Sequence, residues 1–148
     1  MRLWHIDILP FLPKSQLLAQ KRECDLIWRD YKNGKQTNHI LINYIHKYNA
    51  NNFHSYYCEL AHEFVVRNFK FKDNSPLIIK YSPAIIKFDL VKQPFKEHNN
   101  EYLLVCFMNL YEKYIRGQKD FDKATFNKLY DFVNTKFDLK SLGINKEN

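Results

Sequence analysis

The sequence predicts a mainly α fold, a single compact helical domain with an extended N-terminal segment packed against its helices. Only three glycines occur in 148 residues, which favours helices over tight hairpins. Apolar residues recur at helical spacing in several stretches of the chain. Hydrophobic residues also begin at Leu3 and Trp4. Chain ends are usually polar and loose, so a tryptophan at position four indicates that the N-terminus is packed.

The first helix is predicted over residues 15–31. It begins after Pro13, and Asn33-Gly34 is a typical stop signal. Its apolar side at a spacing of 3.6 residues consists of Leu17, Cys24, Ile27, Trp28 and Tyr31. This side is expected to face the core.

Two further helices are predicted in the first half of the chain. Residues 39–48, HILINYIHKY, form a short amphipathic helix with Asn38 available as its cap. Its apolar positions are Ile40, Leu41, Tyr44, Ile45 and Tyr48. Residues 52–69 form a long helix whose core side carries Phe53, Tyr56, Tyr57, Leu60, Phe64 and Val65.

Residues 70–99 show no clear period and contain three prolines. LIIKYSPAIIKF within this segment could be a strand pair, although its proline fits an ordered loop equally well. Helices resume over residues 101–116 and 123–136. With no repeat or linker, residues 1–148 suit one domain, in which 121–148 could be a C-terminal extension of unassigned role.

The chain is basic, with a net charge of +7 and a pI near 9.2. This balance suits a polyanionic partner, most simply nucleic acid, but a compositional bias toward Lys, Asn, Ile and Tyr would produce the same excess. The three cysteines, Cys24, Cys58 and Cys106, include no CxxC, which argues against a disulfide framework or zinc ribbon. With no signal peptide or membrane-length apolar run, we expect a cytoplasmic protein.

Two stretches carry residues with chemical potential. His54, Cys58 and His62 share a helix face, but their outer pair is too widely spaced for one ion without a further ligand. We interpret them as interior or flanking residues and expect no metal.

In QLLAQKRECDLIWRD, Arg22 and Arg29 share a face with Asp25 between them, the pattern of a solvated ion-pair ladder. Glu23 lies at the edge of the apolar face, where a carboxylate is either a surface residue or a catalytic one.

The opening MRLWHIDILPFLPKSQLLAQKRE resembles that of the pyrimidine-dimer DNA glycosylases of the phage endonuclease V type. In that family an arginine follows the terminal residue of the mature chain, and the next helix reads Leu-x-Ala-x-x-Arg-Glu. Arg2 matches the first arginine, and Leu17, Ala19, Arg22 and Glu23 match the helix motif. NGKQTNHILINYI and NLYEKYIRG resemble stretches of bacterial relatives.

The resemblance implies that the α-amine of residue one attacks C1′ of the damaged nucleotide, that a Schiff base forms, and that β-elimination can cut the strand. The bulky Arg2 should block removal of the initiator Met, so the amine would belong to Met1. The segment before Glu23 must then absorb one extra residue relative to the phage enzyme. An α-amine ordinarily has a pKa of about 7.7–8.0, against about 10.4 for lysine, so more of it is neutral at neutral pH.

Roles for other residues follow from the same resemblance. Glu23 would handle protons at the sugar and stabilise the cationic intermediate, while Arg2 and Arg22 would bind phosphates beside the lesion. Further phosphate contacts are expected from Arg29, Lys35 and His39, and from a second patch of Lys113, Arg116 and Lys119.

The implied partner is double-stranded DNA carrying damaged pyrimidines or abasic sites, bound by a monomer without a metal, an organic cofactor or a membrane. The alternative is a non-catalytic basic domain that binds nucleic acid. A pure binder needs neither a free N-terminus nor Glu23, so these two features distinguish the hypotheses.

Overall fold

The computed structural model of the chain describes residues 1–75 and 90–148. These residues form the α-helices α1 (Lys14–Lys32), α2 (Ala50–Val66), α4 (Asn100–Ile115) and α5 (Lys123–Asn134). They also form the short 3-10 helices η1 (Ile6–Phe11), η2 (Asn43–Lys47) and η4 (Lys140–Leu142). The mainly α prediction is confirmed, and the described residues contain no strand. The strand pair considered for LIIKYSPAIIKF lies outside them.

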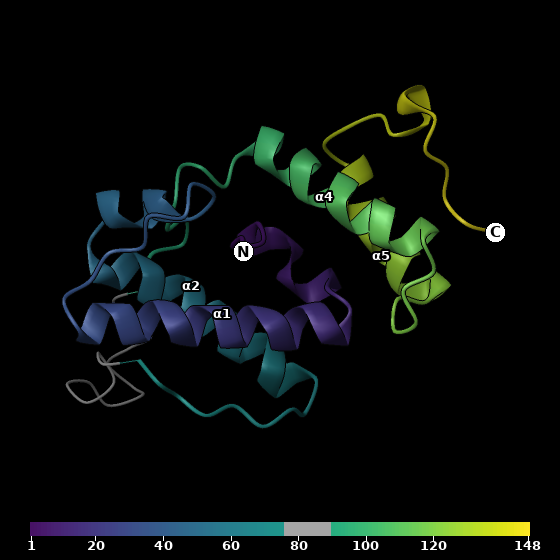
Figure 1. Ribbon diagram of the computed structural model, residues 1–148. Helices are drawn as coiled ribbons and strands as arrows, with labels where there is room; N and C mark the ends of the chain where they lie inside the picture. The colour runs from purple at the N-terminus through teal and green to yellow at the C-terminus, as the bar shows by residue number, and fades with distance from the viewer. Residues whose placement is uncertain (76–89) are drawn as a thin grey trace.

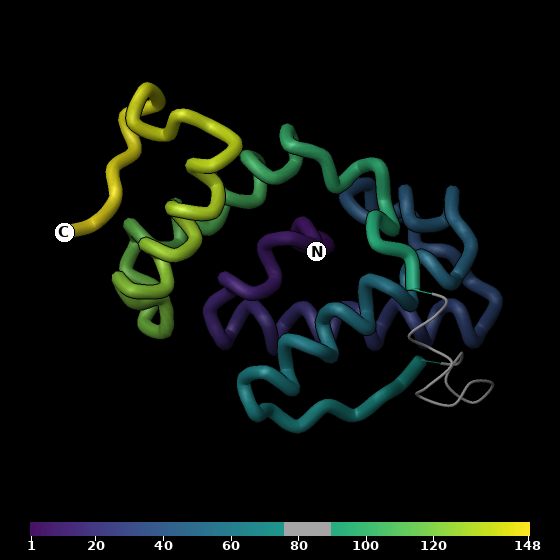
Figure 2. The backbone as a smooth tube through the Cα atoms, turned by 180° about the vertical axis from the view of Figure 1, so that it is seen from behind, coloured from purple at the N-terminus to yellow at the C-terminus, as the bar shows by residue number. Residues whose placement is uncertain are grey.

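The N-terminal segment occupies the middle of the molecule. Figure 1 shows it between α1 and α4, with α2 beside α1 and α5 alongside α4. Figure 2 shows the same central position from behind. η1 packs against α2, α4 and α5. The predicted burial of the N-terminus is therefore confirmed, since Leu3, Ile8 and Leu12 are fully buried.

Helix α1 has the predicted extent to within one residue at each end. Its first turn is tied to the segment between α4 and α5, because the Ser15 backbone N–H donates to Asp120 Oδ2 at 2.7 Å. The helix ends at Asn33-Gly34, where Gly34 adopts the left-handed φ of +66° that favours glycine. Helix α1, which carries the Leu-x-Ala-x-x-Arg-Glu motif, is thus anchored at its N-terminus.

The prediction of a short helix over residues 39–48 is wrong. Only η2 forms there, and Ile40 is 82% and Leu41 42% exposed, so their apolar side chains do not face the core. Ile42, which the apolar spacing leaves out, is fully buried instead, so the stretch packs through a different side chain. Its backbone closes in i→i+3 hydrogen bonds, from Ile42 N–H to the His39 carbonyl at 3.0 Å and from Ile45 N–H to the Ile42 carbonyl at 3.2 Å. Asn38 makes no cap, since η2 begins after Ile42 without a side-chain cap bond.

The segment after Gly117 is packed rather than loose. The Phe132 ring of α5 stacks on Phe11 of η1 with a centroid distance of 5.0 Å. Beyond α5, Ile144 is buried and its carbonyl accepts from Tyr130 Oη at 3.0 Å. Residues after α5 thus support the helix that supports η1.

His98 lies buried beneath the N-terminal segment. Its Nδ1 accepts from the Ile6 backbone N–H at 3.1 Å, and its Nε2 lies 2.8 Å from Tyr44 Oη. Burial, with the neighbouring His5, lowers the pKa of His98 to about 3. The folded protein therefore holds this ring neutral.

We expect the unfolding free energy to fall as the pH drops from 6.5 toward about 3. In that window the unfolded chain binds a proton that folded His98 does not, which costs up to about 1.4 kcal/mol per pH unit. Urea unfolding between pH 4 and 7 measures this slope. His98→Asn should flatten it by about one proton, whereas His62→Asn, at an exposed site on α2, should not. Equal slopes in His98→Asn and the wild type would contradict the assignment.

Candidate active site

The backbone of residues 2–4 is held by Gln20 of α1. Gln20 Oε1 accepts from the Trp4 backbone N–H at 2.7 Å, and its Nε2 donates to the Arg2 carbonyl at 3.0 Å. Tyr56 of α2 donates through its hydroxyl to the Trp4 carbonyl at 2.7 Å and lies 3.0 Å from Gln20 Oε1. Because these buried polar groups are paired with one another, the segment is fixed in one position.

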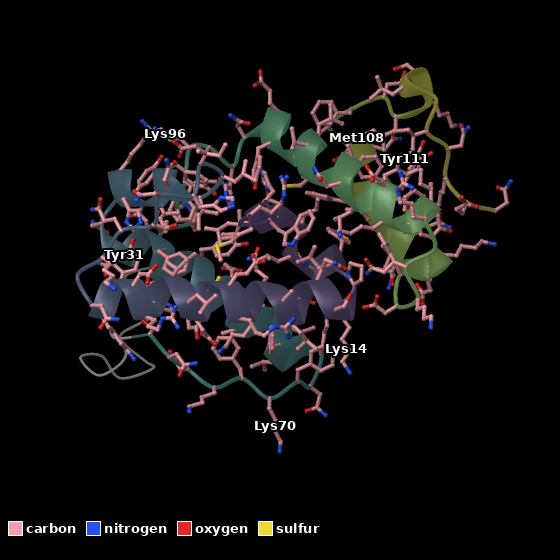
Figure 3. The ribbon with its side chains drawn as sticks, viewed as in Figure 1. Lys14, Tyr31, Lys70, Lys96, Met108 and Tyr111 are labelled. Carbon is pink, nitrogen blue, oxygen red and sulfur yellow. The ribbon has the colours of Figure 1, made fainter. Side chains whose placement is uncertain are left out.

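Helix α4 holds the other side of the same segment. Tyr102 Oη donates to the Leu3 carbonyl at 2.5 Å, and Cys106 Sγ accepts from the His5 backbone N–H at 3.4 Å. The N-terminal segment is therefore bound by side chains from α1, α2 and α4. Figure 3 shows side chains filling the space between α1 and α4, with Lys14 and Tyr31 labelled at opposite ends of α1.

This segment delivers Met1 to a pocket of about 260 Å³. The walls come from the N-terminal segment, α1, the loop between α1 and α2, and α4. The lining residues are Met1, Arg2, Trp4, Gln16, Ala19, Gln20, Glu23, Leu41, Asn109 and Lys113. The two residues expected to be catalytic, Met1 and Glu23, are thus brought together.

Glu23 is half-buried, and its Oε2 accepts from Gln20 Nε2 at 3.2 Å. Burial raises the pKa of the Glu23 carboxyl. The N-terminal ammonium is the largest opposing influence, followed by the Arg2 backbone N–H and the charges of Arg22 and His39. A carboxyl with a raised pKa beside an amine in a pocket is typical of a functional site.

The predicted cations divide into three groups. Arg2, whose guanidinium lies 5.7 Å from the centre of the Trp4 ring, and Lys113 line the pocket. Arg22 and His39 are exposed but act on the Glu23 carboxyl. The pocket-lining set does not include Arg29, Lys35, Arg116 or Lys119. All four are exposed, and Arg116 pairs with Glu112 at 3.1 Å.

The ion-pair ladder considered for α1 does not form. Asp25 instead accepts from Lys21 Nζ at 2.6 Å and from Tyr57 Oη at 2.8 Å. In residues 1–75 and 90–148, no ion pair joins Arg22 or Arg29 to Asp25. The exposed guanidinium of Arg22 can therefore reach a phosphate without breaking such a pair.

The stripe of His54, Cys58 and His62 does not converge on an ion. His54 Nδ1 lies 3.2 Å from Ser75 Oγ and its Nε2 lies 3.4 Å from Cys58 Sγ, while His62 is exposed. Across the part of the chain that the structure describes, no group of three or more His, Cys, Asp or Glu side chains is arranged to hold a metal. None of the described helices is long and apolar enough to cross a membrane.

Sequence reasoning missed Gln20 and Asn109, and it placed Lys113 in a separate patch. A polar residue on the apolar side of a helix was the available signal for Gln20. Asn109 and Lys113 lie on α4, more than 80 residues from Glu23 in the sequence, and no local pattern connects them to the pocket.

The fold and pocket define a basic helical protein in which an amine and a carboxyl group line the same pocket. The profile of the pyrimidine dimer DNA glycosylase family matches residues 1–77, which is more than half of the chain. The chain belongs to this family. The comparison with curated proteins found no match, and neither did the comparison with solved structures.

The Gln20 contacts lead to a stability prediction. Gln20→Met retains the shape of the side chain but leaves the Trp4 N–H and the Arg2 carbonyl without partners. We expect the unfolding free energy to fall by at least about 2 kcal/mol, because each unpaired buried group costs about 1–3 kcal/mol. Denaturant unfolding measures this change.

Gln16→Met is the matched control, on the same helix and in the same pocket. Its Oε1 accepts from Gln118 Nε2 at 2.6 Å on the partly exposed side, where water can replace the lost bond. A loss as large as that of Gln20→Met would show that Gln20 has no special role.

Proposed function

We propose that the chain excises pyrimidine dimers and cleaves the resulting abasic site through a Schiff base on the α-amine of Met1. Glu23 is the carboxyl group that moves protons at the sugar. One observation carries the proposal: Met1 and Glu23 line the same pocket in a member of the pyrimidine dimer DNA glycosylase family. The enzyme acts as a monomer, with residues 1–148 forming one domain.

The first covalent step replaces the glycosidic bond between C1′ and the base with a bond between C1′ and the nitrogen of Met1. The neutral amine donates its lone pair to C1′, and the base leaves with the electrons of the glycosidic bond and takes up a proton. The attached nitrogen then loses one proton, and its lone pair forms the C=N bond as the C1′–O4′ bond opens and O4′ takes a proton from Glu23, which gives the protonated imine. The resemblance to the endonuclease V type supports this order of events.

The second covalent step cuts the strand by β-elimination. A base removes a proton from C2′, and the C3′–O bond breaks with departure of the 3′ phosphate. Water then hydrolyses the imine and returns the free amine of Met1. The sequence of steps is redox-neutral.

Glu23 suits proton transfer because burial raises its pKa. The protonated form persists closer to neutral pH than for an ordinary glutamate, so it can give a proton to O4′. Once ionised, the carboxylate stabilises the positive charge of the protonated imine.

The surrounding cations provide the DNA contacts. Arg2 and Lys113 line the pocket, and Arg22 and His39 lie close enough to act on Glu23. Positive charge around a pocket favours the phosphates that flank a nucleotide inside it. We assign more distant contacts along the backbone to the exposed cations Arg29, Lys35, Arg116 and Lys119.

Borohydride reduction of the imine tests the proposal. We expect the protein to become covalently attached to abasic-site DNA, and peptide mapping to place the link at Met1. An uncleaved tag before Met1 should abolish both trapping and cleavage, because a displacement of about 1 Å can already cost about a hundredfold. The same tag after Asn148, which is exposed, should preserve both.

A non-catalytic binding domain would give no covalent adduct at all. Full activity of the N-terminally tagged protein, or a link mapped to Lys21 or Lys35, would exclude Met1 as the nucleophile.

Glu23→Gln tests the carboxyl group alone. We expect strand cleavage to fall by at least about 10²-fold, the usual contribution of a general acid–base group, while DNA affinity stays within a few-fold of the wild type. Single-turnover cleavage and fluorescence anisotropy measure the two quantities. Glu59→Gln, at an exposed position on α2, is the matched control and should change neither. Wild-type cleavage by Glu23→Gln would remove Glu23 from the mechanism.

A further inference from the structure

Two consecutive apolar residues in the loop between α1 and α2 have exposed side chains. Ile40 is 82% exposed and Leu41 42% exposed, and Leu41 also lines the pocket that holds Met1 and Glu23. Single exposed apolar residues are common on protein surfaces. A neighbouring pair beside a candidate active site, in a stretch whose amphipathic pattern predicted burial, calls for a partner outside the chain.

The turn that carries this pair is held by hydrogen bonds. The His39 carbonyl accepts from the backbone N–H groups of Ile42 and Asn43 at 3.0 and 2.9 Å. His39 Nδ1 also accepts from the Leu41 N–H at 3.2 Å. Ile42 is fully buried and anchors the turn in the core. The backbone that carries Ile40 is therefore held in place, so a partner has little of it left to order.

The charges beside the turn favour DNA as that partner. His39 and Lys35 lie on the same loop, and His39 acts on the Glu23 carboxyl. The net charge of the chain is +7. A nucleotide that enters a protein pocket leaves a gap in the base stack, and apolar side chains inserted between base steps fill such gaps in bent DNA.

We propose that Ile40, supported by Leu41, inserts into the base stack at the lesion and holds the duplex open while the damaged nucleotide occupies the pocket. The proposal rests on the proposed function, because it takes the pocket as the place where the nucleotide reacts. It adds a residue that acts on the duplex and does not touch the reacting atoms. Its effect should therefore depend on whether the substrate has a base stack to open.

Two abasic-site substrates of identical sequence, one single-stranded and one duplex, test this dependence. We expect Ile40→Ala to lower the ratio of the duplex to the single-strand cleavage rate by tenfold or more under single-turnover conditions. Ile40→Leu should restore the ratio, since it restores the apolar volume. Val66→Ala, at a 63% exposed site at the end of α2, is the matched control and should leave the ratio unchanged.

A second readout does not depend on catalysis. A 2-aminopurine next to the abasic site of the duplex should brighten when the wild type binds, because unstacking relieves its quenching. Ile40→Ala at saturating concentration should lose most of that increase. If the wild type formed no borohydride adduct with either substrate, the proposed function would fail, but this fluorescence would still decide whether Ile40 enters the stack.

The contrary outcomes are distinct. An unchanged ratio with unchanged fluorescence would overturn the insertion, and so would an equal loss of rate on both substrates, which would place Ile40 in the chemistry. A dimer of the wild type that dissociates in Ile40→Ala, measured by sedimentation, would assign the apolar pair to a second copy of the chain.

Discussion

The capture of the N-terminal backbone by buried side chains is the constraint on which the pocket depends. A chain end normally gains entropy by moving, so a positioned terminus needs contacts that outweigh this gain. Here Gln20 bonds to the backbone of both Arg2 and Trp4. The Tyr56 hydroxyl donates to the Trp4 carbonyl, and the Tyr102 hydroxyl donates to the Leu3 carbonyl. Because these groups are shielded from water, breaking one contact leaves its partners unsatisfied. The hydrogen bonds are therefore hard to break one at a time, and together they hold Met1 in place.

The same contacts join structure to electrostatics. Gln20 Nε2 donates to the Arg2 carbonyl and to Glu23 Oε2. A single amide therefore orients both the main chain next to Met1 and the Glu23 carboxyl group. Glu23 is buried enough for its pKa to rise, and the surrounding positive charges limit that rise. Proton transfer needs this balance, because a fully ionised carboxylate cannot donate and a permanently protonated one cannot stabilise a cation.

The helices could be predicted from the sequence because their signals are local. Periodic apolar residues and Asn33-Gly34 place both ends of α1 to within one residue. Periodicity places α4 to within one residue and α5 to within two. The prediction for 39–48 fails because the chain buries Ile42 and leaves Ile40 exposed, a choice that depends on packing against the rest of the fold and that periodicity does not contain. The roles of Glu23 and Met1 could be predicted because a local motif carries them. The position of Lys113 in the pocket depends instead on how α4 crosses the N-terminal segment. That crossing rests on contacts such as His5 with Cys106, 101 residues apart, which no local pattern contains.

The contact between Ser15 and Asp120 has a consequence for how the protein can vary. The family profile ends at residue 77, yet the first turn of α1 is held by a carboxylate from the chain beyond it, and Phe11 stacks on Phe132. The matched half thus has no complete core or helix start of its own. An exchange of the chain at that boundary for another sequence would remove Asp120 and Phe132 from their partners, so the part after residue 77 constrains the part that the profile matches.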